Sequence, residues 1–219
     1  ANTLSGRQKQ REYFIMIANV TEANPRWRYA LIGLCMIFSS AFTAAETWQD
    51  IPDADKLFKH YGVSGSFVML DVSNQRYYVN ERSKASKRVV PASTYKIPHS
   101  LIALQLGVVT SVDEILPYGG KSQRLPQWEK DMSLREAITM SNVPVYQGVA
   151  KKIGLTAMRR SLKQLDYGNQ QVGKDVERFW LDGPLAISPR EHVDFLARLA
   201  AKTLPIKEKH QQAVIDILL

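Results

Sequence analysis

Near its middle the sequence reads Pro91-Ala92-Ser93-Thr94-Tyr95-Lys96-Ile97-Pro98, and this stretch decides how the rest of the chain is interpreted. Ser93 and Lys96 are about one helical turn apart, which predicts that the serine hydroxyl and the lysine amine lie on one helix face. A serine becomes an effective nucleophile when a base takes its proton, and an uncharged lysine amine can be that base. Apolar neighbours such as Val90 and Leu101 favour the uncharged form by burying it. Because Ser-x-x-Lys also occurs by chance on solvated surfaces, its meaning depends on what else the chain carries.

The composition is that of an ordinary globular protein with an excess of basic residues. The chain has 219 residues, 45% of them hydrophobic and 23% charged, enough for one sizeable domain or two small ones. Its net charge is +8, but the basic residues are scattered and no aromatic-basic stacking motif accompanies them. We therefore expect a solvated basic surface and no nucleic-acid partner.

The N-terminal region has the pattern of a secretory signal peptide. Arg26 and Arg28 precede an apolar run over 29–42 that small residues follow up to Ala45, and the run is shorter than the about 20 residues that span a bilayer. We expect a signal peptide at 26–45, a cleaved periplasmic protein without stable membrane association, and no fold for the upstream extension 1–25. An uncleaved anchor is the alternative. The only cysteine, Cys35, lies in this run, so the mature part has no disulfide.

The mature part, 46–219, mixes strand and helix patterns and predicts an α/β (α+β) domain. Two capping boxes, at Ser133 and Ser188, mark helix starts. The helix that opens at Ser133 is expected to run into the stretch 141–143, where Pro144 discourages its continuation. The remaining elements are expected as a hairpin over 66–80, a basic loop over 81–88, a loop over 113–128, and helices over 53–61, 93–106, 145–153, 156–165, 189–202 and 207–219.

Three further stretches could contribute to a site, although each has an ordinary structural explanation. Ser141-Asn142-Val143 stands at a break between helices, where the serine could project into a cleft or the segment could simply cap the next helix. Tyr167-Gly168-Asn169 is typical of a turn that ends a helix. Phe179-Trp180-Leu181 is typical of a hydrophobic core.

Together and in this order, Pro-Ala-Ser-Thr-Tyr-Lys, Ser-x-Val, Tyr-Gly-Asn and Phe-Trp-Leu resemble the class D β-lactamases, the oxacillinases. The resemblance runs from about Trp48 to the last residue. It implies the serine β-lactamase and penicillin-binding-protein-like fold, a helical region with an antiparallel sheet. Class A enzymes also have Ser-x-x-Lys, but their second motif is Ser-Asp-Asn, whereas Val143 here favours class D.

The resemblance implies a role for each matching residue. Ser93 is expected to attack the β-lactam carbonyl and, through its backbone N–H, to form half of the oxyanion hole. Lys96 is expected to be the general base as an N-carboxylated lysine, formed with carbon dioxide or bicarbonate. Trp180 is expected to donate its indole N–H to that group, over which Val143 packs. Ser141 is expected to relay a proton to the leaving nitrogen.

Tyr167 and Asn169 are expected to be architectural supports of this site. The substrate that the resemblance implies is a small-molecule β-lactam of the penicillin type, whose hydrolysis confers antibiotic resistance. Neither a metal nor any cofactor besides carbon dioxide is implied.

The sequence departs from the family pattern at its C-terminal end. The third family motif, Lys-Thr/Ser-Gly on a strand, is absent, because Lys202-Thr203 is followed by Leu204 at the end of a predicted helix. We expect the C-terminal strands to be missing and only the hairpin to form the sheet. We also expect a truncated chain that is poorly stable and inactive unless the rest follows.

Two other functions use similar residues. A β-lactam-binding sensor domain resembles class D enzymes but stays acylated instead of turning over. Such sensors resemble the C-terminal part of a long membrane protein that also has a zinc protease domain. None of the four histidines here falls in His-Glu-x-x-His. A peptidoglycan transpeptidase also uses Ser-x-x-Lys, but Trp180 and the Tyr-Gly-Asn stretch argue against it.

Overall fold

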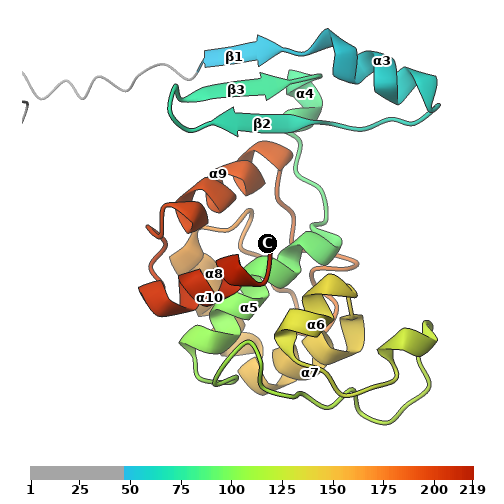
Figure 1. The fold of residues 1–219 in the computed structure, drawn as a ribbon, viewed down its shortest axis with the longest axis vertical. Helices are drawn as coiled ribbons and strands as arrows, with labels where there is room; N and C mark the ends of the chain where they lie inside the picture. Colours follow the sequence, from blue (N-terminus) through green and yellow to red (C-terminus); the bar gives the residue numbers. More distant parts are fainter. Residues whose placement is uncertain (1–46) are drawn as a thin grey trace, which may run out of the picture. The chain divides into compact units, whose positions relative to one another are not determined.

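The computed structural model describes residues 47–219, so the predictions for 1–25, for the signal peptide 26–45 and for Cys35 lie outside the described residues. The strands are β1 (Thr47–Asp50), β2 (Val68–Asp71) and β3 (Arg76–Val79) (Figure 1). The helices are α3 (Pro52–His60), α4 (Arg82–Ala85), α5 (Lys96–Gln105), α6 (Leu134–Thr139), α7 (Val143–Ile153), α8 (Leu155–Leu165), α9 (Pro189–Ala200) and α10 (Glu208–Asp216), with 3-10 turns η2 (Ala92–Tyr95) and η3 (Pro126–Trp128).

The sheet has three strands in the order β1-β3-β2. The predicted hairpin is confirmed, because β2 and β3 pair antiparallel. The expectation that this hairpin alone forms the sheet is wrong, since β1 adds to it parallel to β3. The four residues of β1 carry too little pattern to predict a strand. Pairing with β3 and the stacking of Trp48 on Tyr77, at a ring distance of 5.0 Å, decide it.

Two helix boundaries also differ from the predictions. The stretch 81–88, expected as a loop, contains α4, which buries Ala85. The helix expected from residue 145 begins at Val143, because Pro144 lies in its first turn, where a missing N–H costs nothing. The Asn142 side chain caps this helix by accepting a hydrogen bond of 3.0 Å from the Val145 N–H.

Helix α5 is the central helix of the helical region, in contact with α7 and α10 (Figure 1). Its apolar residues from Leu101 to Leu104 are buried in the core. Lys96, His99 and Ser100 are polar and buried on the same helix. Among the described residues, no helix is both long and apolar enough to cross a membrane.

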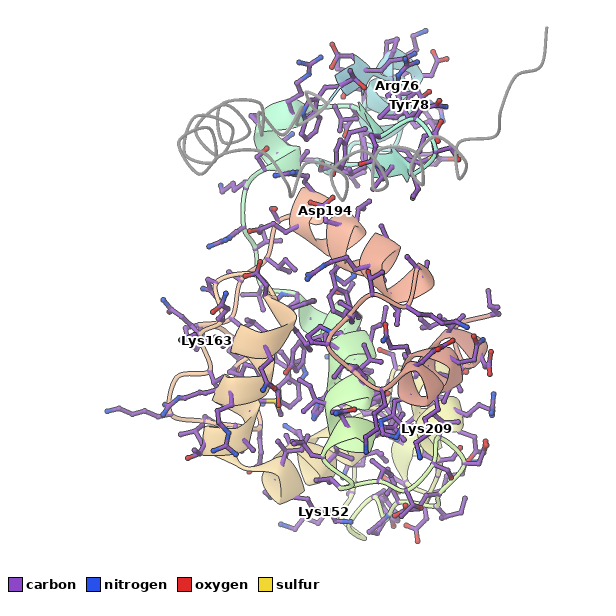
Figure 2. The ribbon with its side chains drawn as sticks, turned by 90° about the vertical axis from the view of Figure 1, so that its left-hand side faces the viewer. Arg76, Tyr78, Lys152, Lys163, Asp194 and Lys209 are labelled. Carbon is purple, nitrogen blue, oxygen red and sulfur yellow. The ribbon has the colours of Figure 1, made fainter. Side chains whose placement is uncertain are left out.

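Helix α9 contacts the sheet through a polar cluster. The Tyr77 hydroxyl on β3 donates a hydrogen bond to Asp194, which Figure 2 shows on α9. Arg190 lies 3.4 Å from Asp194, and its guanidinium stands 5.5 Å from the Tyr77 ring centre. Burial and the bond to Asp194 raise the pKa of Tyr77 to about 12, so the hydroxyl remains a donor.

The start of α9 is fixed by the predicted capping box, which is confirmed. Ser188 accepts from the Glu191 N–H at 3.2 Å, and Glu191 accepts from the Ser188 N–H at 2.8 Å. The Glu191 carboxylate also accepts a hydrogen bond from the Arg88 Nε–H, which is 3.0 Å from both of its oxygens, and a second one from Arg88 Nη2. Arg88 stands just before the β-bridge between Val89 and Ile187. The Arg88 guanidinium above all, and then the Ser188 bonds, lower the pKa of Glu191 to about 2.

This carboxylate predicts a pH-dependent contribution to stability. The pKa of Glu191 is lower in the folded chain than its ordinary value of 4.5, so its stabilisation is present above that value and is lost as the pH falls toward 2. We expect Glu191→Gln to lower the free energy of unfolding most at about pH 6, with a difference that shrinks below about pH 5. Urea unfolding at several pH values measures it.

The matched control is Glu208→Gln, since that side chain is 75% exposed in its pair with Lys202. A surface pair of this kind contributes little to stability. A Glu191→Gln difference that stays constant from about pH 6 to about pH 2 would contradict the role of the ionised carboxylate.

Candidate active site

The nucleophile candidate and its base candidate are joined by a short helical turn. Ser93 lies in η2, which continues directly into α5 at Lys96. The Lys96 amine donates a hydrogen bond of 3.1 Å to Ser93 Oγ, so the one-turn spacing does place both groups on the same face. The Ser93 side chain reaches an exposed surface, whereas Lys96 is only 1% exposed.

Ser141 completes a triangle with these two residues. The Lys96 amine donates to Ser141 Oγ at 3.0 Å, and Ser141 Oγ donates to Ser93 Oγ at 2.7 Å. Both explanations of the 141–143 segment therefore hold, because Asn142 caps α7 while Ser141 projects toward Ser93. Two segments that lie 45 residues apart in the sequence thus bring three polar groups into mutual hydrogen-bond distance.

Each of the two segments contains one residue with a left-handed backbone conformation. Ala92 and Ser141 have φ values of 48° and 51°, which are uncommon for residues other than glycine. Hydrogen bonds hold both segments: the Ala92 N–H donates to the Trp180 carbonyl at 2.9 Å, and the Trp128 indole N–H donates to the Met140 carbonyl at 3.1 Å. Such conformations persist where the surroundings fix them, which is typical of functional sites.

Burial sets the charge of the lysine. Its amine stands 5.7 Å from the ring centre of Tyr146, and within the described part of the chain no carboxylate forms an ion pair with it. Desolvation lowers the pKa of Lys96 from its ordinary 10.5 to about 8. A substantial fraction of the amine is therefore uncharged in mildly alkaline water, which is the form that a general base requires.

An aromatic cluster borders the lysine. Trp180 is fully buried, stacks on Tyr95 at a ring distance of 5.7 Å and meets His99 edge-on at 5.3 Å. Its indole N–H has no hydrogen-bond partner among the described residues. A buried donor without a partner, in contact with His99 on the helix that carries Lys96, fits the N-carboxylated form of Lys96, which would supply the acceptor.

The other predicted residues lie around this centre. Val143 opens α7 directly after the Ser141-Asn142 pair. Tyr167 is fully buried against Tyr95, with its hydroxyl 3.2 Å from His192 Nδ1. The Asn169 side chain donates to the Pro184 carbonyl at 2.8 Å and accepts from the Ala186 N–H at 3.0 Å. These two hydrogen bonds connect the turn at 169 to the segment that follows Trp180. Their roles remain predictions.

Sequence reasoning did not single out three residues at this site. Tyr146 and His99 pack around the buried lysine, and Trp128 holds the Met140 carbonyl. The one available signal was for His99, which stands one helical turn after Lys96. Tyr146 and Trp128 depend on contacts between segments that no local pattern predicts.

A cavity of about 350 Å³ lies beside the Ser93 turn. Its lining includes Pro91 and Thr94 from the turn, Phe67 from the sheet side, and Ile187 and His192 from the segment around the start of α9. The Ser93 hydroxyl is not part of that lining, so the reacting group opens to solvent next to the cavity.

Comparisons with known proteins place this chain in a family. A model of the penicillin binding protein transpeptidase domain matches residues 65–218. The crystal structure of FUS-1 (OXA-85), a class D β-lactamase from Fusobacterium nucleatum subsp. polymorphum, is 38% identical, with a TM-score of 0.75 over 77% of this chain and 70% of that one. The chain belongs to the class D β-lactamase family.

Two further relatives agree with this assignment. A class D β-lactamase from Sebaldella termitidis is 33% identical, with a TM-score of 0.76 over 80% of this chain and 71% of that one. Beta-lactamase OXA-10 of Pseudomonas aeruginosa is 37% identical over 164 residues, which are 75% of this chain and 62% of OXA-10. The chain thus spans about 62% of the length of that relative. The predicted family and fold class are both confirmed.

The buried amine predicts that this class D chain gains stability when the lysine is replaced. The pKa of Lys96 is lower in the folded chain than its ordinary value, so the charged form destabilises the fold below about pH 8, and this cost disappears above the ordinary value. We expect Lys96→Met to raise the free energy of unfolding by roughly 1–3 kcal/mol near neutral pH. The gain is expected to decline as the pH rises toward 10.5.

Urea unfolding in bicarbonate-free buffer measures this gain at each pH. Lys163→Met is the matched control, because Lys163 is exposed on the outer face of α8 (Figure 2) and its replacement should change stability little. A destabilised Lys96→Met variant near neutral pH would contradict the proposed cost of burying the amine.

Proposed function

We propose that this protein is a serine β-lactamase that hydrolyses the β-lactam ring of penicillin-type antibiotics through an acyl-enzyme on Ser93 and so confers resistance. The observation that carries the proposal is the hydrogen-bonded triangle of Ser93, Lys96 and Ser141. It joins a nucleophile, a base of lowered pKa and a second hydroxyl that can move a proton. The relatives that share the family are named β-lactamases.

Acylation follows from the three distances of the triangle. Ser93 Oγ attacks the ring carbonyl carbon while its proton moves to the Lys96 side chain, whose nitrogen lies 3.1 Å away. The ring C–N bond then breaks, and Ser141 donates its proton to the leaving nitrogen while it takes one from Lys96, 3.0 Å away. The Ser93 backbone N–H, in the turn that opens α5, is proposed to stabilise the carbonyl oxygen as half of an oxyanion hole.

Hydrolysis of the acyl-enzyme requires a base that is charged and close. We propose that Lys96 carries this function as an N-carboxylated side chain formed with carbon dioxide, which when present supplies an anionic oxygen base for both half-reactions. Trp180 would hold this group through its indole N–H, and Val143 would pack against it. A water that gives a proton to this base then attacks the ester carbonyl. The ester C–O bond breaks, and Ser93 Oγ takes the proton back as it leaves as a hydroxyl.

We also propose that the enzyme acts in the periplasm. The basic flank at Arg26 and Arg28, the apolar run and the small residues before Glu46 support export by a cleaved signal peptide. The substrate is then met outside the cytoplasm.

The central test is the intact mass, after a penicillin is added, of a protein in which this chain is joined to the C-terminal strands of the family. We expect an adduct of the mass of the penicillin on Ser93 that forms and then clears, because acylation and hydrolysis use the same triangle. Ser93→Ala should give no adduct, whereas Ser83→Ala, at an exposed serine of α4, should behave as the wild type.

Each other outcome of this measurement has a definite meaning. An adduct that persists would indicate a β-lactam sensor rather than a hydrolase. No adduct on the wild-type chain, or an adduct that Ser93→Ala retains, would contradict the proposed function.

A second prediction concerns the indole of Trp180. Trp180→Phe keeps an aromatic ring of similar shape but removes the N–H, so we expect the adduct to clear about tenfold more slowly and to need more bicarbonate. The rate of adduct clearance, with and without added bicarbonate, measures this. Trp48→Phe removes an indole from the sheet and should leave clearance unchanged. Clearance that is independent of bicarbonate in the wild type would contradict the carboxylated lysine.

A further inference from the structure

His99 is a fully buried imidazole one helical turn after Lys96 on α5. Neither of its ring nitrogens has a hydrogen-bond partner within residues 47–219. The adjacent buried residue on the same helix contrasts with it, because the Ser100 hydroxyl donates to the Lys96 carbonyl at 2.8 Å and lies 2.8 Å from the Tyr146 hydroxyl. The helix therefore satisfies one buried polar side chain fully and leaves the other without a partner.

The His99 ring lies among the same side chains that border the lysine. It contacts Trp180 edge-on at a ring distance of 5.3 Å and Tyr146 at 5.2 Å. The Tyr146 ring is also the one above which the Lys96 amine stands. Since the Trp180 indole nitrogen likewise has no partner in the described part of the chain, two buried rings in contact with each other carry N–H groups that lack an acceptor.

If position 99 served only to pack the core, an apolar side chain there would give a more stable fold than histidine. A buried polar group without a partner destabilises a fold, whereas an apolar group of similar size can be neutral or stabilising. Burial and the neighbouring Lys96 charge lower the pKa of His99 to about 3, so the ring is neutral and has one N–H donor and one acceptor nitrogen. A neutral donor can bind an anion without adding a positive charge beside the amine.

We propose that His99 is an anion-binding residue of this site, and that its N–H acts together with the Trp180 indole N–H to bind the carboxylate of N-carboxylated Lys96. This proposal rests on the function proposed above and extends it to a residue that the family motifs do not include. The two rings and the amine lie in one buried cluster, so a carboxylate on Lys96 would be enclosed between donors and shielded from water.

The carboxylation step that His99 would favour balances without an oxidant or reductant. The uncharged Lys96 nitrogen forms a bond to the carbon of carbon dioxide and loses one proton to solvent, which leaves an anionic carboxylate. The two ring N–H groups stabilise that anion and do not change their own protonation. Carbon dioxide is the only co-reactant.

The test is carbon-13 NMR of the full-length chain in buffer with labelled bicarbonate. The lysine carbamate signal, titrated against bicarbonate, gives a dissociation constant for the wild type, His99→Leu and His99→Asn. We expect His99→Leu to weaken binding about tenfold or more, because it removes a hydrogen bond to a charged group. His99→Asn, which keeps an N–H donor, should restore binding to within about threefold of the wild type.

Unfolding in bicarbonate-free buffer separates this role from packing. His99→Leu is expected to be as stable as the wild type or more stable, so weaker carbon dioxide binding would not reflect a damaged fold. His99→Phe is a second apolar variant of similar ring size, should the leucine variant not fold.

The remaining outcomes contradict the proposal in distinguishable ways. A wild-type carbamate signal with unchanged binding in the apolar variants would overturn the role of His99 alone. Equal weakening in His99→Leu and His99→Asn would assign the effect to shape and also overturn it. If the wild type gives no carbamate signal, both this proposal and the carboxylated lysine are overturned. Acylation of Ser93 is tested independently by the intact-mass measurement after a penicillin is added.

Discussion

A lysine amine held out of water against two serine hydroxyls is the contact on which the site depends. Burial of Lys96 lowers its pKa to about 8, and the amine then has to be satisfied by groups that carry no charge. Ser93 and Ser141 do this at 3.1 and 3.0 Å. The same arrangement that satisfies the buried amine thus places an amine of lowered pKa next to a serine hydroxyl.

The residues around Lys96 include several features that lower the stability of the folded chain. Helix α5 carries Lys96 and His99 into a core otherwise made of apolar residues, and Trp180 closes the cluster with a buried indole. The unpartnered nitrogens there and the left-handed backbone at Ala92 and Ser141 are all unfavourable for the fold itself. Such departures are expected where a site needs groups that a core alone would not retain.

The scaffold compensates with ordinary, well-formed interactions elsewhere. Capping boxes at Ser133 and Ser188 begin α6 and α9, and Glu191 adds the pair with Arg88 to the second of them. The Tyr77–Asp194 hydrogen bond connects α9 to the sheet. These contacts fix the segment 187–189 and, through the Val89–Ile187 bridge, the chain just before the Ser93 turn.

The sequence by itself determined the features that depend on near neighbours. The one-turn spacing put Ser93 and Lys96 on one face, and capping boxes marked two helix starts. Two strand-like stretches joined by the short turn 72–75 predicted the hairpin, because all these patterns act over a few residues. Tertiary structure alone decided the contact of Ser141 with Ser93, 48 residues away, the addition of β1 to the sheet, and the unpartnered state of His99. Each of these depends on which surfaces pack together, and no local pattern contains that information.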